Sequence, residues 1–396
     1  MTVPAKPAPF DPDDPLGLDE LLAPDELGVR DTMREWAAAR ILPHIAEWYE
    51  QGRLPGIREL ARELGSIGAL GMTLTGYGCT GASAVQYGLA CLELEAADSG
   101  IRSLVSVQGS LAMYAIHRYG SEEQRERWLP GMAAGEIIGC FGLTEPDQGS
   151  DPAGMRTRAR RDGSDWVLDG RKMWITNGSV AGVAVVWAGT DEGIRGFLVP
   201  AGTPGFTAPE IHHKWSLRAS VTSELVLDGV RLPADAVLPG ADGLRAPLGC
   251  LNHARYGIVW GSMGAARSSF AAALAYSRTR EQFGRPIGGF QLTQAKLADM
   301  AVELHKGLLL AHHLGRRMDA GRLRPEQVSF GKLNNVREAI EICRTARTIL
   351  GANGISLEYP VMRHATNLES VLTYEGTVEM HQLVLGKALT GQDAFR

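Results

Sequence analysis

Between residues 183 and 200 the chain reads Val183-Ala184-Val185-Val186-Trp187-Ala188 and then Gly196-Phe197-Leu198-Val199-Pro200. Apolar, β-branched and aromatic residues dominate both runs, and an Asp-Glu-Gly turn separates them, as is typical of neighbouring β-strands. Trp166-Val167-Leu168 and Ser223-Glu224-Leu225-Val226-Leu227 have the same character on either side. The sequence therefore predicts a compact β block, from Ile137 to Pro239.

Helical patterns flank this block. From Gly17 to about Ala134, apolar residues recur at three- and four-residue spacing. Towards the C-terminus three long helices are predicted, and Gly351 ends the last of them: Gly257 to Arg280, Phe290 to Ala320 and Pro325 to Leu350. This order predicts an α+β fold with an N-terminal α-helical domain at 1–138, a middle β-barrel domain at 139–242 and a C-terminal helical domain at 243–396.

Composition excludes several classes of protein. The 396 residues carry a net charge of -5, whereas a nucleic-acid binder usually carries a basic surplus. The sequence contains no run of 18 apolar residues, so we predict no membrane span. The N-terminus through Asp11-Pro12-Asp13-Asp14-Pro15 has neither an apolar signal core nor an Arg-rich start, so a cytoplasmic protein is expected.

Cysteine and histidine spacing predicts neither disulfides nor a metal site. The five cysteines are scattered, without a Cys-x-x-Cys pair, and suit reduced thiols in the cytosol. The ten histidines include no His-Glu-x-x-His motif. We therefore expect no metal.

Gly76-Tyr77-Gly78-Cys79-Thr80-Gly81 matches the Gly-x-Gly-x-x-Gly fingerprint of dinucleotide-binding folds, and Glu95 follows about twenty residues later. The stretch before it, Gly71 to Thr75, is a poor strand. No strand follows the helix predicted from Ala82 to Ala97, so the βαβ unit is missing. These glycines are better explained by a tight surface loop.

Tyr374-Glu375-Gly376-Thr377-Val378 is the candidate catalytic segment. A carboxylate beside a glycine can be directed into an apolar pocket, where desolvation raises its pKa and makes it a stronger base. A lone Glu-Gly pair, however, usually lies in a solvated loop. Four other segments accompany it in order: Phe141-Gly142-Leu143-Thr144-Glu145-Pro146, Gly149-Ser150-Asp151, Lys172-Met173-Trp174-Ile175-Thr176-Asn177 and Arg280-Glu281-Gln282-Phe283-Gly284. Together they resemble the acyl-CoA dehydrogenase family, whose members use FAD to oxidise CoA thioesters.

The resemblance covers nearly the whole chain and implies a C-terminal four-helix bundle. It also implies that Glu375 abstracts the Cα proton, while its own N–H and a flavin hydroxyl bind the thioester oxygen. It assigns FAD binding to the middle domain, where Trp174 alone would read as an ordinary strand aromatic, and to later segments that cross a subunit boundary. The implied FAD contacts are Phe141, Leu143, Thr144, Gly149, Ser150, Trp174, Ile175, Thr176, Arg280, Phe283, Gln291, Gly351, Gly354, Thr377 and Glu379.

Two of these segments depart from the family pattern. Ala352 replaces the usual second glycine of the Gly351-Ala352-Asn353-Gly354-Ile355 loop. Many relatives carry Gln where Glu379 stands, so the adenine-side contact of Glu379 is less certain than that of Thr377.

Arg102 indicates which acyl group the substrate carries. Glu95, Ser99 and Arg102 would share one face of a continuous helix. The arginine could be a surface ion-pair partner of Glu95, or it could grip a carboxylate inside a pocket. The segment resembles that of the glutaryl-CoA dehydrogenases within the family, where this arginine holds the distal carboxylate of glutaryl-CoA.

That resemblance extends to Gly139–Pro146, Arg195–Leu198, Leu217–Ser220 and Gly249–Ile258. It implies dehydrogenation followed by decarboxylation to crotonyl-CoA and CO2, a step of lysine degradation. Tyr374 supports the decarboxylation, because relatives that do not decarboxylate lack this tyrosine. The implied substrate contacts are Glu95, Arg102, Ser103, Ser150, Leu251, Asn252 and Arg255. Implied partners are an electron-transferring flavoprotein and three further copies of the chain, in a homotetramer. A different short or branched acyl-CoA, or oxidation of glutaryl-CoA without decarboxylation, remains the alternative.

Overall fold

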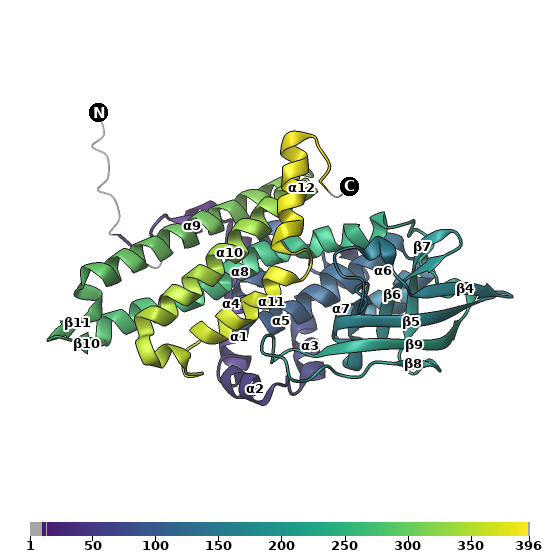
Figure 1. The fold of residues 1–396 in the computed structure, drawn as a ribbon, viewed down its shortest axis with the longest axis horizontal. Helices are drawn as coiled ribbons and strands as arrows, with labels where there is room; N and C mark the ends of the chain where they lie inside the picture. Colours follow the sequence, from purple (N-terminus) through teal and green to yellow (C-terminus); the bar gives the residue numbers. More distant parts are fainter. Residues whose placement is uncertain (1–9, 13, 395–396) are drawn as a thin grey trace.

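The computed structural model describes residues 10–12 and 14–394, which form a helical segment, a sheet and a second helical segment (Figure 1). The predicted α+β organisation is therefore confirmed. The expectation about the start of the chain falls largely on residues 1–9 and 13, which lie outside the described part.

In the N-terminal helical segment, α1 and α5 pack against α4 (Ala84–Ala97). Ser83 caps this helix, because its hydroxyl accepts a hydrogen bond from the Gln86 N–H while the Ser83 N–H donates one to the side-chain oxygen of Gln86. The other helices are η1 (Leu18–Leu21), α1 (Pro24–Arg40), α2 (Ile45–Gln51), α3 (Ile57–Ser66), α5 (Ser99–Ser106), the π-helix η2 (Val107–Met113), α6 (Tyr114–Tyr119) and α7 (Glu122–Ala133).

The glycine-rich stretch is a small hairpin. Strands β1 (Thr75–Gly76) and β2 (Cys79–Thr80) pair antiparallel around Tyr77 and Gly78, both of which have positive φ. α4 follows, and α5 succeeds it without a strand between them. The interpretation of this motif as a surface loop is confirmed.

α4 and α5 do not form one continuous helix, so the predicted shared face of residues 95, 99 and 102 is wrong. Asp98 is extended between them, with φ -166° and ψ 142°, and its carboxylate caps α5 by accepting the Gly100 N–H at 2.7 Å. Arg363 and Asn367 of α11 (Val361–Thr373) donate to the same carboxylate at 2.6 and 2.9 Å. These buried contacts stabilise the elbow, a tertiary effect that the helical spacing could not reveal.

The middle segment is a curled seven-stranded sheet (Figure 1). Its strands are β3 (Gly139–Gly142), β4 (Arg158–Asp162), β5 (Asp165–Thr176), β6 (Val183–Thr190), β7 (Gly193–Pro200), β8 (Phe206–Thr207) and β9 (Thr222–Leu232), joined by η3 (Pro152–Gly154) and η4 (Gly178–Val180) and followed by η5 (Ala234–Ala236). The strand order is β3-β6-β4-β5-β9-β8, with β7 paired to β6 in the register Val183↔Pro200.

All four predicted strands fall within β5, β6, β7 and β9. The curled sheet encloses a small apolar core of its own, which includes Trp166, Leu168, Phe197 and Leu225. Side chains fill the inside of the sheet, as they fill the inside of a small barrel.

The C-terminal segment is the expected helical bundle, in which α8 and α10 each pack against α9, α11 and one another, and α12 packs on α10. Its remaining elements are α8 (Arg245–Thr279), β10 (Glu281–Gln282), β11 (Arg285–Pro286), η6 (Ile287–Gly289), α9 (Gln291–Asp319), α10 (Pro325–Leu350), η7 (Gly351–Ile355) and α12 (Val378–Thr390). The predicted bounds of α9 and α10 are confirmed to within a residue.

α8 begins at Arg245, twelve residues before its predicted start. Asn252 and Arg255 lie in this first part and interrupt the apolar pattern, because they face a polar site rather than the core. Further along, a Cβ at Gly264 would collide with the Leu92 carbonyl of α4, so this glycine lets the two helices approach closely.

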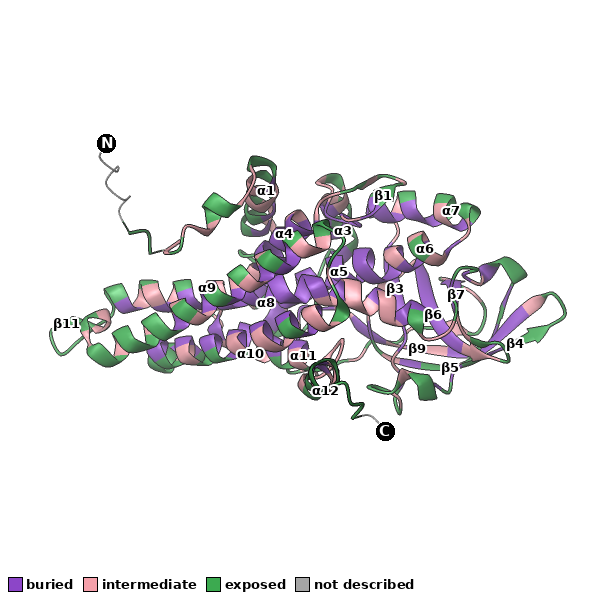
Figure 2. Ribbon diagram, turned by 90° about the horizontal axis from the view of Figure 1, so that it is seen from above, coloured by how far each residue is buried: buried purple, intermediate pink, exposed green. Residues whose placement is uncertain are grey.

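The main core runs along the contact between α4, α8 and α10, where Figure 2 shows continuous buried residues. α8 is buried over much of its length because helices cover it on several sides. Among the described residues, no helix is both long and apolar enough to cross a membrane.

Candidate active site

Glu375 lies in the short turn between α11 and α12. Its φ is 54°, in the left-handed region that a side chain with a Cβ rarely adopts unless its surroundings fix it. Gly376 follows with φ 97°, and a Cβ there would meet Nε2 of His381 at 2.9 Å. The glycine after Glu375 is therefore required by the packing of α12.

Three consecutive carbonyls of this turn accept hydrogen bonds from cationic side chains. Nζ of Lys332 in α10 donates to the oxygens of Tyr374 and Gly376 at 2.7 and 2.6 Å. Nε of Arg255 in α8 donates to the Glu375 oxygen at 2.6 Å. Two helices thus hold the backbone on both sides of the candidate base.

The Glu375 carboxylate has the properties expected of a base. Its Oε2 is buried and has no hydrogen-bond partner within the described chain. Burial raises the pKa of Glu375, and the charges of Arg102, Lys332 and Arg255 oppose that rise only in part. A desolvated carboxylate with a free oxygen can accept a proton from a ligand.

Arg102 is 1 % exposed and Glu95 is fully buried, so the interpretation of this pair as surface residues is wrong. Nε of Arg102 lies 2.7 Å from Oε2 of Glu95, and its Nη2 donates to the hydroxyl of Tyr374. No group of the described chain accepts from Nη1, and Oε1 of Glu95 is also without a partner. The guanidinium is therefore held beside the base-bearing turn with donor capacity left for a ligand.

The structure also brings most of the other predicted substrate residues to this place. Ser103 is buried next to Arg102 on α5. Asn252 accepts a hydrogen bond from Nη1 of Arg255 at 3.0 Å, and Leu251 is half-buried beside it. Ser150 is exposed in the loop that follows β3, outside this cluster of contacts.

The predicted flavin residues of the sheet occupy one loop region and one strand end. Lys172 of β5 is buried and ties the loop down, because its Nζ donates to the Leu143 carbonyl and to Glu145 at 3.0 and 2.9 Å. Trp174, in contrast, is 58 % exposed with φ 63°, and open space surrounds Gly149. A large planar ligand can therefore reach this region, where Thr144, Ile175 and Thr176 also lie.

Part of this region belongs to the sheet itself. Phe141 and Gly142 lie in β3, which pairs in parallel with β6. The Phe141 ring packs against Trp187 in the core, with ring centroids 5.9 Å apart, and Leu143 is buried as well. Because both side chains are buried, only the backbone groups of Phe141 and Leu143 could face a ligand.

A single chain does not bring all the predicted flavin residues together. Arg280, Phe283, Gln291 and Gly351 are exposed at the end of the bundle around β10 and β11, which Figure 1 shows at the opposite end of the molecule from the sheet. The Phe283 ring is 96 % exposed. Gly354 is buried in η7, whereas Thr377 caps α12 and Glu379 is exposed in its first turn.

Lys332 and His381 belong to the site but were not predicted. Val328, Lys332 and Val336 recur at four-residue spacing on the buried face of α10, so a lysine within an apolar stripe was the available signal. His381 of α12 is buried, and burial lowers its pKa to about 3.

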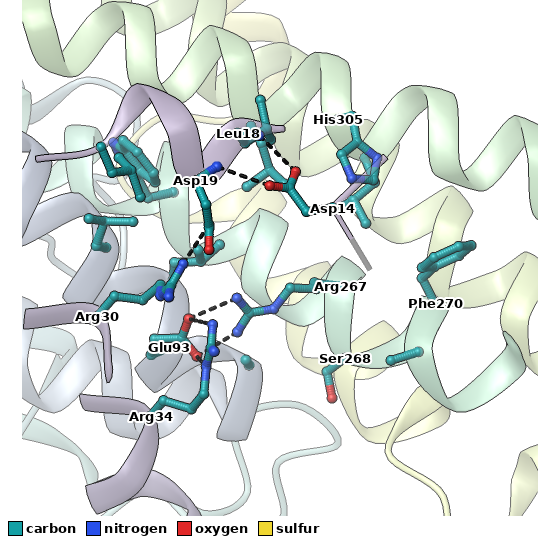
Figure 3. A pocket seen from close by; sticks show the side chains of 18 of the residues that line it. Asp14, Leu18, Asp19, Arg30, Arg34, Glu93, Arg267, Ser268, Phe270 and His305 are labelled. Carbon is teal, nitrogen blue, oxygen red and sulfur yellow. Dashed lines mark hydrogen bonds and ion pairs between the residues drawn. The ribbon is translucent and has the colours of Figure 1, made fainter. Parts of the chain in front are cut away.

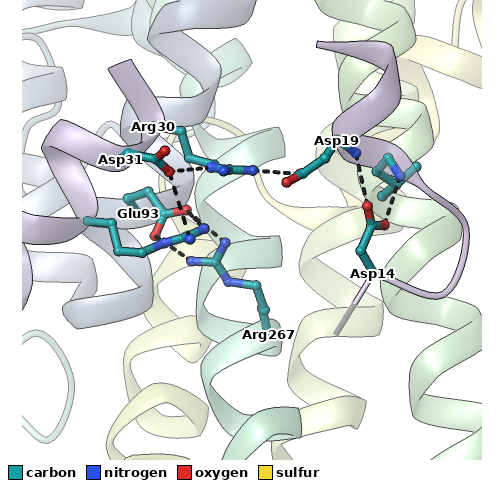
Figure 4. Close-up of polar contacts among 8 residues, drawn as sticks. Asp14, Asp19, Arg30, Asp31, Glu93 and Arg267 are labelled. Carbon is teal, nitrogen blue, oxygen red and sulfur yellow. Dashed lines mark hydrogen bonds and ion pairs between the residues drawn. The ribbon is translucent and has the colours of Figure 1, made fainter. Parts of the chain in front are cut away.

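A cavity of about 580 Å³ lies elsewhere, between α1, α4, α8 and α9 (Figure 3). Its charged groups already have partners: Arg34 and Arg267 both bind the buried Glu93, and Arg30 binds Asp19 (Figure 4). Burial alone would raise the pKa of Glu93, but the two guanidinium groups lower it below its ordinary value. Because the carboxylates of Asp14, Asp19 and Glu93 all have partners, we do not assign the reaction to this cavity.

Three domain families match the chain in order. The acyl-CoA dehydrogenase N-terminal domain matches residues 23–136, the middle domain 140–230 and the C-terminal domain 241–390. The chain belongs to the acyl-CoA dehydrogenase family and is an enzyme of that family.

Two solved structures are especially similar. The crystal structure of a glutaryl-CoA dehydrogenase from Mycobacterium smegmatis is 71% identical with a TM-score of 0.96, over 98% of this chain and 100% of that one. A structure of a glutaryl-CoA dehydrogenase from the same organism in complex with FADH2 is 65% identical with the same TM-score and coverage. The mitochondrial short-chain specific acyl-CoA dehydrogenase of Bos taurus is 34% identical over 368 residues, which are 90% of this chain and 88% of the relative.

Proposed function

We propose that this enzyme is an FAD-dependent, decarboxylating glutaryl-CoA dehydrogenase. The observation that carries the proposal is the buried guanidinium of Arg102, fixed between Glu95 and Tyr374 beside the candidate base. An uncharged acyl chain would leave this cation without a ligand, whereas a distal carboxylate would complete its hydrogen bonds. The 71% identity to a glutaryl-CoA dehydrogenase supports the same substrate.

Glu375 acts first, as the base that removes a proton from Cα of the thioester. Its free Oε2 accepts the proton, and its raised pKa makes it a stronger base than a solvated carboxylate. The N–H of Glu375 donates to the thioester oxygen as negative charge develops there. FAD, when bound, supplies the acceptor for the hydride that leaves Cβ.

The open surface at Trp174 and Gly149 supports binding of the flavin ring near Thr176. Arg280, Phe283, Gln291 and Gly351, which the family resemblance implies as FAD contacts, lie at the far end of the bundle, so we infer that a neighbouring copy supplies them. This requires an oligomer with each flavin at a subunit boundary, and the family resemblance implies a homotetramer. Light scattering on the flavin-loaded enzyme tests this inference, and a flavin-loaded monomer would refute it.

Arg102 then acts in the second half of the reaction, the decarboxylation. By holding the distal carboxylate, it places the γ-carbon in line for loss of CO2 after the α,β double bond has formed. The electrons of the broken bond delocalise towards the thioester oxygen, where the same N–H donor stabilises them. Protonation by the conjugate acid of Glu375 gives crotonyl-CoA. This chemistry would place the enzyme in lysine degradation in the cytoplasm, with an electron-transferring flavoprotein as the electron acceptor.

A dehydrogenase of another short or branched acyl-CoA is the second candidate, supported by the 34% identity to a short-chain enzyme. Oxidation of glutaryl-CoA without decarboxylation is a variant of the first. Both differ from our proposal in substrate or product and not in the base.

Anaerobic bleaching of the flavin by a panel of acyl-CoAs, with CO2 measured, distinguishes these candidates. We expect glutaryl-CoA to bleach the flavin fastest and to release one CO2 for each crotonyl-CoA formed. Glu375→Gln, nearly isosteric, should keep the flavin but slow bleaching by about 10²-fold or more. Near-normal bleaching by this variant would show that another residue is the base.

A further inference from the structure

Lys332 is an ionisable group in the site to which the proposed reaction gives no task. It is 2 % exposed, which is rare for a lysine, and it lies on α10 rather than on the base-bearing turn. Two of its three N–H donors are used by the carbonyls that precede and follow Glu375, at 2.7 and 2.6 Å. The ammonium therefore grips the turn on both sides of the base.

We propose that Lys332 is the positioning residue of this site: it fixes the left-handed backbone of Glu375 and keeps the carboxylate next to Arg102 in its ionised form. The inference deepens the proposed function and rests on Glu375 being the base. Lys332 does not touch the reacting carbons; it acts through the turn.

Backbone geometry supports this role. Without external contacts, Glu375 would relax from φ 54° to negative values, which would redirect its carboxylate. Arg255 holds only the central carbonyl, that of Glu375 itself, whereas Lys332 holds the two that flank it. Since displacement of a catalytic group by 1 Å can cost about 10²-fold in rate, a contact that fixes this turn is decisive for catalysis.

The same lysine links the base to the arginine. Tyr374 offers its carbonyl to Lys332 and its hydroxyl to Arg102, so one residue joins both cations. These contacts fix the position of the turn that carries Glu375 relative to Arg102 on α5 and Lys332 on α10.

Charge supports the second part of the role. The charged groups that act on Lys332 are Glu375, which favours its ammonium form, and Arg255 and Arg102, which oppose it. Burial lowers the pKa of Lys332, and in return its charge lowers the pKa of Glu375 against the larger effect of desolvation. His381, which approaches from α12, is neutral at physiological pH because its pKa is lowered to about 3.

The test compares Lys332→Met, which removes charge and donors at similar length, with Lys306→Met. Lys306 is exposed on α9 and pairs only with Glu303, so it is the matched control. Both flavin-loaded enzymes are checked for flavin content and urea stability, and the rate of flavin reduction by glutaryl-CoA is then measured against pH.

For Lys332→Met we expect kcat to fall by about 10²-fold with a smaller change in KM, because the base is displaced rather than the substrate site. The pH midpoint of the rate should also rise, since Glu375 loses a neighbouring positive charge. A variant with normal flavin content, wild-type kcat and an unchanged midpoint would overturn the proposal.

Lys332→Ala provides a second measurement if the methionine variant does not fold. Ethylammonium can enter the space left by the side chain and donate to the two carbonyls, whereas tetramethylammonium has no N–H donors. Restoration of kcat by ethylammonium alone supports the proposal, and failure of saturating ethylammonium to restore any activity overturns it. Glu375→Gln in the same assay keeps the two hypotheses separate. If that variant still reduces flavin normally, the proposed base is wrong, whatever Lys332 does.

Discussion

Replacing Arg102 tests the proposed substrate most directly. Its guanidinium is buried against Glu95 at 2.7 Å, and neither side chain can reach solvent. Arg102→Met alone would strand the Glu95 carboxylate and cost about 3–5 kcal/mol of folding stability. The informative variant is therefore the double substitution Glu95→Gln with Arg102→Met, which removes both charges and preserves most of the volume.

The size of the effect follows from the pairing. Loss of the partner of a buried charge costs about 2–5 kcal/mol, which at 1.36 kcal/mol for each factor of ten is a fall of roughly 30-fold to several thousand-fold in kcat/KM for glutaryl-CoA. Butyryl-CoA has no distal carboxylate, so its kcat/KM should change little or rise as the pocket becomes apolar.

The assay is kcat/KM for both thioesters with the same enzyme preparation. The ratio of the two values is the decisive quantity, because damage to the fold or loss of flavin lowers both together. An unchanged ratio would refute the reasoning: Arg102 would then be a structural ion-pair residue, and the glutaryl assignment would rest on similarity alone.

Two further predictions concern the same site. Burial raises the pKa of Glu375 above its ordinary 4.5, and the proposed base acts only when it is ionised. The rate of flavin reduction should therefore fall as the pH decreases, with a midpoint above 4.5. A rate that stays constant down to pH 4.5 would contradict this prediction. Gly261→Ala should lower both stability and the glutaryl-to-butyryl ratio, because its Cβ would collide with Oε2 of Glu95 and lie 3.3 Å from Nε of Arg102. The control Gly386→Ala, with no neighbour within 4 Å, should leave the ratio unchanged and should not lower the stability to urea, because alanine is favoured over glycine within α12.

Local sequence predicted much of the fold, since helical and strand periodicities record which faces are buried. The bounds of α9 and α10 and the strands β5, β6, β7 and β9 all follow from such patterns. The start of α8 did not, because Asn252 and Arg255 face the site and break the apolar pattern.

In the candidate site, too, some features followed from local sequence and others only from the tertiary structure. The sequence by itself determined the family, and it predicted the pentapeptide Tyr374–Val378 and Arg102 as site residues, since each of these signals rests on short stretches of contiguous residues. Only the tertiary structure decided that Arg102 is buried, because its burial depends on the elbow at Asp98, which α11 stabilises from 265 and 269 residues away. The contacts of Lys332 were equally hidden, since the carbonyls that accept from its ammonium group belong to a turn more than forty residues later in the chain.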